Sequence, residues 1–238
     1  MKVTAYSDNL YQLTYMGMMN CYLVREDDGF TLIDAIVGGQ AQAIMQKARK
    51  LGLPIARIAL THAHADHIGS LDALHEALPD VPVAISERDT RFLSGDMSLD
   101  PLEPQTKLRG GYPGCQTKPT VLLREGDRFG SLEVIATPGH AAFFDTRDRA
   151  VIAGDAMQTL GGVAVSGTIR PLFPLPALST WNKGLALESA RKLLALQPSV
   201  LAIGHGRMLK QPQEAMERAI RVTERELAKE GGAQPHGA

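Results

Sequence analysis

Cysteine is scarce in this chain of 238 residues, which contains only Cys21 and Cys115. Two cysteines cannot form the disulfide framework that stabilises many small secreted folds, so a scaffold of that kind is excluded. Cys21 falls in the apolar pattern Cys-Tyr-Leu-Val, which is typical of a buried strand. We therefore expect its thiol to pack as a small hydrophobic group.

Excess charge and long apolar runs are also missing. The chain has 25 basic and 26 acidic residues, and a net charge of −1 gives no electrostatic basis for binding nucleic acid or an anionic membrane. No apolar run approaches the roughly 20 residues that span a bilayer. The first residues, Met-Lys-Val-Thr-Ala-Tyr-Ser-Asp, lack the apolar core of a signal peptide. These absences predict a cytoplasmic protein with neither a nucleic-acid nor a membrane partner.

Hydrophobic residues, at 44% of the chain, are plentiful enough for a large core. Alternating apolar patterns predict strands over 3–6, 10–14, 21–25, 30–34, 55–60, 82–86, 121–123, 132–136, 142–144, 150–153 and 199–203. Helical spacing predicts helices over 41–51, 68–78, 87–94, 180–196 and 212–229. Strands followed by helices, twice over, predict an α+β sandwich of two mixed sheets with helices outside. We expect one domain over 1–230 and a disordered tail over 231–238, which contains His236.

The run His62-Ala63-His64-Ala65-Asp66-His67 places three imidazoles and a carboxylate in six residues. It lies between a predicted strand and a predicted helix. Residues i and i+2 of an extended segment point the same way, so His62 and His64 can converge on one metal ion. Asp66 and His67 lie where the chain turns, and they suit a second ion nearby. Imidazole and carboxylate are typical ligands of zinc, iron and manganese.

Three further polar groups follow predicted strands, each beside a turn glycine. These motifs are Thr137-Pro138-Gly139-His140, Ala153-Gly154-Asp155 and Ile203-Gly204-His205-Gly206. Glycine permits a close approach of the backbone, and strand ends deliver ligands to one rim of a sheet. His75 falls in the middle of a predicted helix and is not expected to be a ligand.

In this order and context, the motifs resemble those of the metallo-β-lactamase superfamily, from Thr31-Leu-Ile-Asp34 to His205. The resemblance implies a four-layer αβ/βα sandwich of two mixed β-sheets flanked by helices. It also implies seven metal ligands, and it places two ions at the rim of the sheets. One ion would be held by His62, His64 and His140, and the other by Asp66, His67 and His205. Asp155 would bridge the ions, and Asp34 would orient ligand histidines from behind.

The implied cofactors are two divalent ions, of which Zn²⁺ is favoured, although iron or manganese also suits these ligands. A hydroxide bridging them would attack an acyl carbon, and Asp66 would accept or relay the proton. The predicted reaction is hydrolysis of a small neutral ester or lactone. A thioester or phosphotriester is the alternative within this fold. A mononuclear iron dioxygenase acting on a thiol or persulfide is the rival of another class, and a metal-stabilised binding protein is a third alternative.

Two departures from the family bear on the substrate. Related lactonases carry a tyrosine three residues after the bridging aspartate, whereas this chain has Gln158, whose amide can donate to an oxyanion. Many relatives also place a second Gly-His four residues after the metal-binding histidine, and here Ala141-Ala142-Phe143-Phe144 follows His140 directly.

Type-II glyoxalases append a helical region after the last ligand. Only 33 residues follow His205, which disfavours that branch.

Irregular segments are expected to shape the substrate pocket. Residues 95–119 are rich in glycine and proline, and they predict a lid or pocket wall, or else a surface insertion. Met18, in the Met-rich turn 15–19, and Phe173, in the irregular segment 160–179, are candidate substrate contacts beside Gln158. Leu172 and Leu175 could extend an apolar wall over the metals. The two irregular segments rich in glycine and proline, 95–119 and 160–179, could instead form a homodimer contact.

Overall fold

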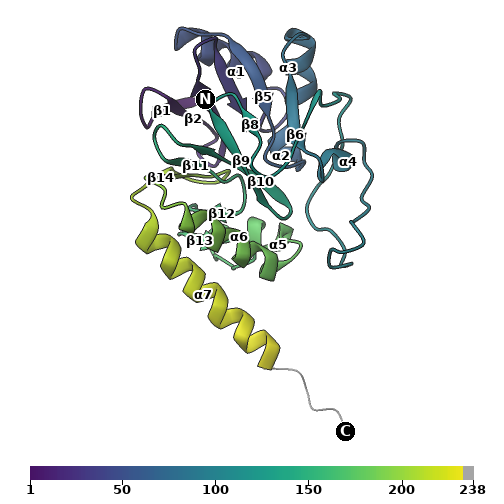
Figure 1. The fold of residues 1–238 in the computed structure, drawn as a ribbon, viewed down its shortest axis with the longest axis vertical. Coiled ribbons are helices and arrows are strands. Elements are labelled where there is room, and N and C mark those ends of the chain that lie inside the picture. The colour runs from purple at the N-terminus through teal and green to yellow at the C-terminus, as the bar shows by residue number, and fades with distance from the viewer. Residues whose placement is uncertain (233–238) are drawn as a thin grey trace.

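The computed structural model describes residues 1–232, whose long strands gather in two mixed sheets (Figure 1). The first sheet has seven strands in chain order: β1 (Lys2–Ala5), β2 (Leu10–Tyr15), β3 (Met19–Arg25), β4 (Phe30–Ile33), β5 (Ile55–Ala59), β6 (Val83–Ser86) and β7 (Val121–Leu123). Neighbours are antiparallel from β1 to β4 and parallel from β4 to β7.

The second sheet has six strands in the order β15-β14-β11-β10-β9-β8. They are β8 (Arg128–Phe129), β9 (Leu132–Thr137), β10 (His140–Asp145), β11 (Ala150–Ile152), β14 (Val200–Ala202) and β15 (Leu209–Lys210). Strands β11 and β14 are parallel, and the other neighbours are antiparallel. A short separate ribbon pairs β12 (Met157–Gln158) with β13 (Ala164–Val165).

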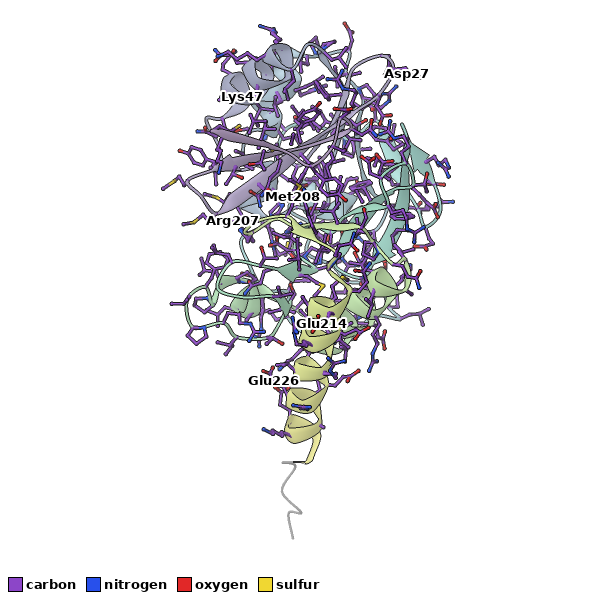
Figure 2. All side chains as sticks on the ribbon, turned by 90° about the vertical axis from the view of Figure 1, so that its left-hand side faces the viewer. Asp27, Lys47, Arg207, Met208, Glu214 and Glu226 are labelled. Carbon is purple, nitrogen blue, oxygen red and sulfur yellow. The ribbon has the colours of Figure 1, made fainter. Side chains whose placement is uncertain are left out.

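Helices cover the outer faces of both sheets (Figure 1). The first half contributes α1 (Ala41–Lys50), α2 (Ala65–Ile68), α3 (Leu71–Ala77) and α4 (Thr90–Leu93). The second half contributes α5 (Leu175–Ser179), α6 (Lys183–Ala195) and α7 (Gln213–Gly232). Figure 2 shows α7 extending away from the sheets, from Glu214 past Glu226. Within residues 1–232, no helix is both long and apolar enough to cross a membrane.

The core explains the layering, because successive side chains of a strand point to opposite faces. In β3, Cys21 and Leu23 pack toward the cluster formed with α1 and α3, whereas Tyr22 and Val24 pack between the sheets. In β10, Phe143 lies between the sheets, and its neighbours on the other face pack toward α6 and α7. Three apolar layers thus separate four layers of secondary structure. The predicted fold class, an αβ/βα sandwich of two mixed sheets, is confirmed.

The sequence-based element boundaries need several corrections. The helix predicted over 68–78 is shorter and corresponds to α3, which begins at Leu71. At the break between α2 and α3, the Ser70 hydroxyl donates to the carbonyl of Val37 and accepts from the N–H of Gln40. The segment 160–179 is not wholly irregular, since it contains β13 and α5. The helix predicted to end at 229 continues to Gly232. The rest of the predicted tail, including His236, lies outside the described residues.

His140 also begins a strand where the sequence suggested the end of one. Thr137 and His140 are paired residues of β9 and β10, and Pro138-Gly139 forms the tight turn between them. Gly139 has φ +91, a conformation that favours glycine. His140 is therefore held by the backbone of a hairpin.

Candidate metal centre

Strand ends bring the predicted ligands to one rim. β4 and β5 are parallel with Ile33 beside Ala59, so Asp34 follows one strand where the metal motif follows the other. β11 and β14 are parallel with Ile152 beside Ala202, so Asp155 and His205 emerge at the same end. Parallel register therefore explains why Asp34 lies beside the metal motif and why Asp155 lies beside His205, although each pair is far apart in the sequence.

The first ligand group consists of His62, His64 and Asp155, whose ligand atoms lie within 4.8 Å of one another. His62 Nε2 lies 2.9 Å from His64 Nδ1. The other nitrogen of His64, Nε2, donates to the carbonyl of Arg109 at 3.2 Å, so Nδ1 is the free nitrogen of the neutral ring. Two buried histidines thus direct nitrogen lone pairs at one point, as metal ligands do.

The second group consists of Asp66, His67 and His205. Asp66 Oδ2 lies 3.2 Å from His205 Nε2 and 4.0 Å from His67 Nε2. His205 Nδ1 donates to the carbonyl of Met18 at 3.2 Å, which leaves Nε2 facing the carboxylates. The division into two groups matches the two ions that the sequence motifs implied.

Asp155 lies between the groups. Its Oδ2 is 3.9 Å from His62 Nε2 and 3.2 Å from His205 Nε2, and its Oδ1 is 3.3 Å from His67 Nε2. Among the described residues, Asp155 Oδ1 and His67 Nε2 are buried atoms without a hydrogen-bond partner. A buried carboxylate oxygen facing an imidazole nitrogen requires a proton or a cation between them. This donor set therefore fits a pair of divalent cations.

Asp34 supports both groups from behind. Its Oδ2 accepts a hydrogen bond from His67 Nδ1 at 2.8 Å and another from Thr61 Oγ1 at 2.7 Å. Thr61 Oγ1 in turn accepts from His62 Nδ1 at 3.0 Å, and the backbone N–H of Thr61 donates to Asp34 Oδ1. One buried carboxylate thereby fixes the ring orientation of a ligand in each group. Thr61 was missed from the sequence, where it precedes the motif without any signal of its own.

We expect Asp34→Asn to lower metal affinity by about 10- to 100-fold, because the amide removes the negative charge and replaces one of the two accepting oxygens with an NH2 group, which cannot accept a hydrogen bond from Thr61 or His67. Asparagine tolerates the backbone conformation at this position, where φ is +63, so the variant should fold. Competition with a chelator measures the affinity. Asp28→Asn, which removes a surface partner of Arg57, is the control. Wild-type metal affinity in Asp34→Asn would show that Asp34 does not orient the ligands.

His140 lies against the first group without joining its compact cluster. Its ring centroid is 4.4 Å from that of His62, with the rings at 69°. The compact group is completed by Asp155 instead. The role of His140 as the third ligand of the first ion stays a prediction.

The three candidate substrate residues lie in different settings. Phe173 is buried, its ring centroid is 5.2 Å from that of His205, and it lines a cleft of about 90 Å³ beside Asp66 and Asp155. Gln158 is buried behind it and donates to the carbonyl of Phe173 at 3.4 Å. Met18 contacts the metal centre through its backbone carbonyl, which accepts a hydrogen bond from His205. Of the three, Phe173 alone lines this cleft.

The segment 95–119 contains no helix or strand, as predicted, and it packs against the metal motif. The carbonyl of Arg109 holds His64, and the carbonyl of Gly111 accepts from the N–H of Ala65. A Cβ on Gly110 would lie 2.4 Å from His64 Nε2, so glycine is needed for this approach. The segment is thus a wall of the site, and whether it opens as a lid stays a prediction.

Comparison with known proteins identifies the family. The family model of the metallo-β-lactamase superfamily matches residues 15–205, a range that includes Asp34 and every predicted ligand. The chain belongs to the metallo-β-lactamase superfamily.

Relatives within the superfamily match most of the chain. YobT of Bacillus subtilis is 49% identical over 228 residues, which are 92% of this chain and 97% of YobT. The hydroxyacylglutathione hydrolase GloC of Haemophilus influenzae is 27% identical over 199 residues, covering 79% of this chain and 85% of GloC. The crystal structure of TTHA1623 in a di-iron-bound form has a TM-score of 0.59 and 28% identity, covering 85% and 94% of the two chains.

The predicted histidine ligands of this metallo-β-lactamase-fold centre fall into two sets according to the direction in which their pKa is shifted. Burial lowers the pKa of His140 to about 3 and that of His62 well below its usual value. Burial acts in the same direction on His205, but the carboxylates of Asp155 and Asp66 outweigh it and raise the pKa of His205 to about 10. Asp155 and Asp34 likewise raise the pKa of His67 above its usual value. Without metal at neutral pH, His62 and His140 are neutral, whereas His67 and His205 carry protons.

Metal binding at Asp66, His67 and His205 should consequently depend steeply on pH. An ion must displace one proton from each histidine, and each displaced proton makes apparent affinity about tenfold weaker per unit of falling pH below its pKa. Displacement of the His205 proton alone leads us to expect a loss of at least about tenfold per unit between pH 8 and pH 6 for this ion, and a weaker dependence for the ion at His62 and His64. Chelator competition at several pH values measures both. Equal slopes for the two ions would contradict the assignment.

Proposed function

We propose that this protein is a dinuclear metal-dependent hydrolase that cleaves a neutral ester or lactone. The main support is the central carboxylate of Asp155, which faces ligand nitrogens of both groups while its Oδ1 and His67 Nε2 have no partner among the described residues. When bound, two divalent cations would supply the positive charge that acidifies water and polarises a carbonyl oxygen. His62, His64 and His140 would hold one of them, and Asp66, His67 and His205 the other, with Asp155 shared.

Asp66 is the residue placed to move a proton. It lines the cleft, and 34% of its side chain is exposed, whereas Asp155 is buried. Burial alone would raise the pKa of Asp66, but the adjacent His205 and His67 hold it below its usual value. An ionised, accessible carboxylate can accept a proton from water during attack on an acyl carbon. Phe173 would exclude water from the other side of the reacting group.

A thioester is the second candidate substrate, and the match to the hydroxyacylglutathione hydrolase GloC favours it. Attack on the acyl carbon would be the same for an ester and a thioester. A preference for one of them would therefore depend on how the site recognises the leaving group. Zinc is our preferred ion. The di-iron form of TTHA1623 supports iron as the alternative. A phosphotriester as substrate and manganese as the ion are the further alternatives.

Metal analysis of the purified protein, combined with a substrate panel, tests the proposal. The panel contains a lactone, an aryl ester, a thioester, a phosphotriester and a β-lactam, each assayed with metal-free and reloaded protein. We expect two ions per chain and turnover of the ester or lactone that disappears on metal removal. One iron per chain with oxygen uptake on a thiol or persulfide would instead establish the dioxygenase alternative.

A cytoplasmic location and a homodimer remain part of the proposal. Sedimentation of the metal-loaded protein over a range of concentrations measures the oligomeric state.

A further inference from the structure

Helix α5 and the turn before it present two different faces. Phe173, Pro176 and Ala177 are buried on the inner side. Leu172, Leu175 and Leu178 are exposed by 87%, 59% and 58%. Large apolar side chains with this exposure, grouped within seven residues, indicate a surface that something apolar contacts.

Leu175 connects this exposed surface with the metal centre. It lines the cleft together with Phe173, Pro176 and the ligands Asp66, Asp155 and His205. The cleft measures about 90 Å³, whereas pockets that enclose a whole small-molecule ligand measure about 300–1,000 Å³. It can therefore hold only the reacting group of a substrate, and the remainder must leave the cleft along its edge.

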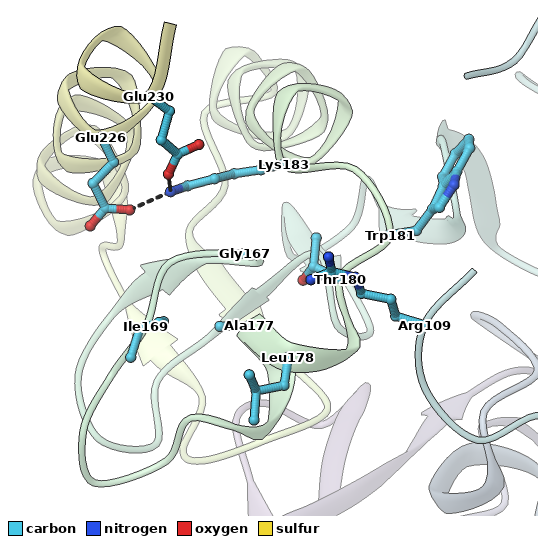
Figure 3. Close-up of a pocket in the computed structure, with 10 residues that line it drawn as sticks. All are labelled: Arg109, Gly167, Ile169, Ala177, Leu178, Thr180, Trp181, Lys183, Glu226 and Glu230. Carbon is cyan, nitrogen blue, oxygen red and sulfur yellow. Dashed lines mark hydrogen bonds and ion pairs between the residues drawn. The ribbon is translucent and has the colours of Figure 1, made fainter. Parts of the chain in front are cut away.

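The edge offers no cation to an anionic substrate. Neither lysine nor arginine is found among the described residues that line the cleft, and Asp66 and Asp155 are both present. Arg109 and Lys183 line a separate cavity of about 490 Å³, which is also lined by Leu178 on α5 (Figure 3). There Lys183 is already paired with Glu226 and Glu230. The described wall of the cleft thus offers no lysine or arginine that could pair with an anionic substituent of the substrate.

We propose that the substrate carries a medium-length aliphatic acyl chain, which leaves the cleft over Leu175 and lies along Leu172. This inference rests on the proposed hydrolase function and specifies its substrate class. Two observations carry it: the cleft is too small for more than the reacting group, and Leu175 continues its wall onto the exposed surface. An acyl-glutathione, with its carboxylates, would not be favoured at this edge.

A series of p-nitrophenyl esters from acetate to octanoate tests the chain. A fully buried methylene is worth about fourfold in affinity, and along an open edge we expect kcat/KM to rise by about tenfold over the series. Leu175→Ser should remove most of this rise while leaving metal content unchanged. Leu178→Ser is the matched control, because it lies on the same helix with nearly the same exposure but lines the other cavity. It should keep the wild-type rise.

Calorimetry separates this inference from the proposed function. Octanoate, acetate and succinate are titrated into the metal-loaded protein, and octanoate should bind about tenfold more tightly than either, with the gain lost in Leu175→Ser. If no ester is hydrolysed but octanoate binds in this way, the hydrolase proposal fails and the acyl-chain surface stands. Equal binding of octanoate and acetate, equal loss in both leucine variants, or preference for succinate would overturn the inference.

Discussion

Asp155→Asn is expected to reduce metal content from two ions to one or fewer and to lower kcat/KM by about 1,000-fold or more. Asp155 faces His62, His67 and His205 at 3.9, 3.3 and 3.2 Å, so its carboxylate lies against imidazole nitrogens of both compact ligand groups. The amide keeps the shape of the side chain but removes its negative charge, which both ions need. Metal analysis and ester hydrolysis measure the two effects.

Asp145→Asn provides the control for this variant. Asp145 is also a buried carboxylate, at the far end of β10, but it pairs with Arg147 and not with the ligands. Its replacement should lower thermal stability and leave two ions per chain. If Asp155→Asn retains both ions at wild-type affinity, the shared-ligand assignment is wrong.

Gly204→Ala should also disable the centre, although residue 204 is not a ligand. A Cβ at this position would lie 2.1 Å from Asp155 Oδ1 and 2.8 Å from His67 Cε1. The backbone of Gly204 does not have a positive φ, so the whole effect comes from this contact. The carboxylate must rotate away, and a misplacement of about 1 Å in a catalytic group can cost about 100-fold in rate. We expect loss of at least one ion and a decrease of about 100-fold in kcat/KM.

Gly111→Ala is matched to Gly204→Ala because a Cβ there would only touch the Cβ of Ala65 at 4.0 Å. It should keep both metal ions. Metal content is measured on the two variants after reloading, and thermal unfolding is measured on their metal-free forms. Together the two measurements distinguish a damaged metal site from a damaged fold. Normal metal content in Gly204→Ala would mean that Asp155 has an alternative position compatible with both ions.

The ligands could be predicted because their signals are local. A histidine or aspartate beside a turn glycine at the end of an apolar strand is visible in the sequence, and parallel pairing explains how such ends meet. The division into His62 with His64 and Asp66 with His67 follows from the extended-to-helical change of direction at α2.

What could not be predicted depends on contacts between distant segments. Thr61 acquires its role only because Asp34 lies across from it, and Arg109 holds His64 through a carbonyl that any residue could supply. Gln158 was expected at the substrate, but the path of the chain buries it behind Phe173. Helix α5 has too few residues for a periodic pattern, so the helix was not predicted, although Leu175 within it was expected in an apolar wall over the metals.

The origin of the ligands has a consequence for unfolding. His62 and His64 follow a strand of the first sheet, as do Asp66 and His67, whereas Asp155 and His205 follow strands of the second. Each ion would therefore cross-link the two halves of the sandwich, as a disulfide does in a secreted protein. The separated halves cannot complete either site, so each ion would bind only when the two halves are packed together. Free ion at 1,000 times its dissociation constant would therefore stabilise the folded state by about 4 kcal/mol per ion. A chain with two unpaired cysteines can obtain from its cofactor the cross-link that its side chains do not form.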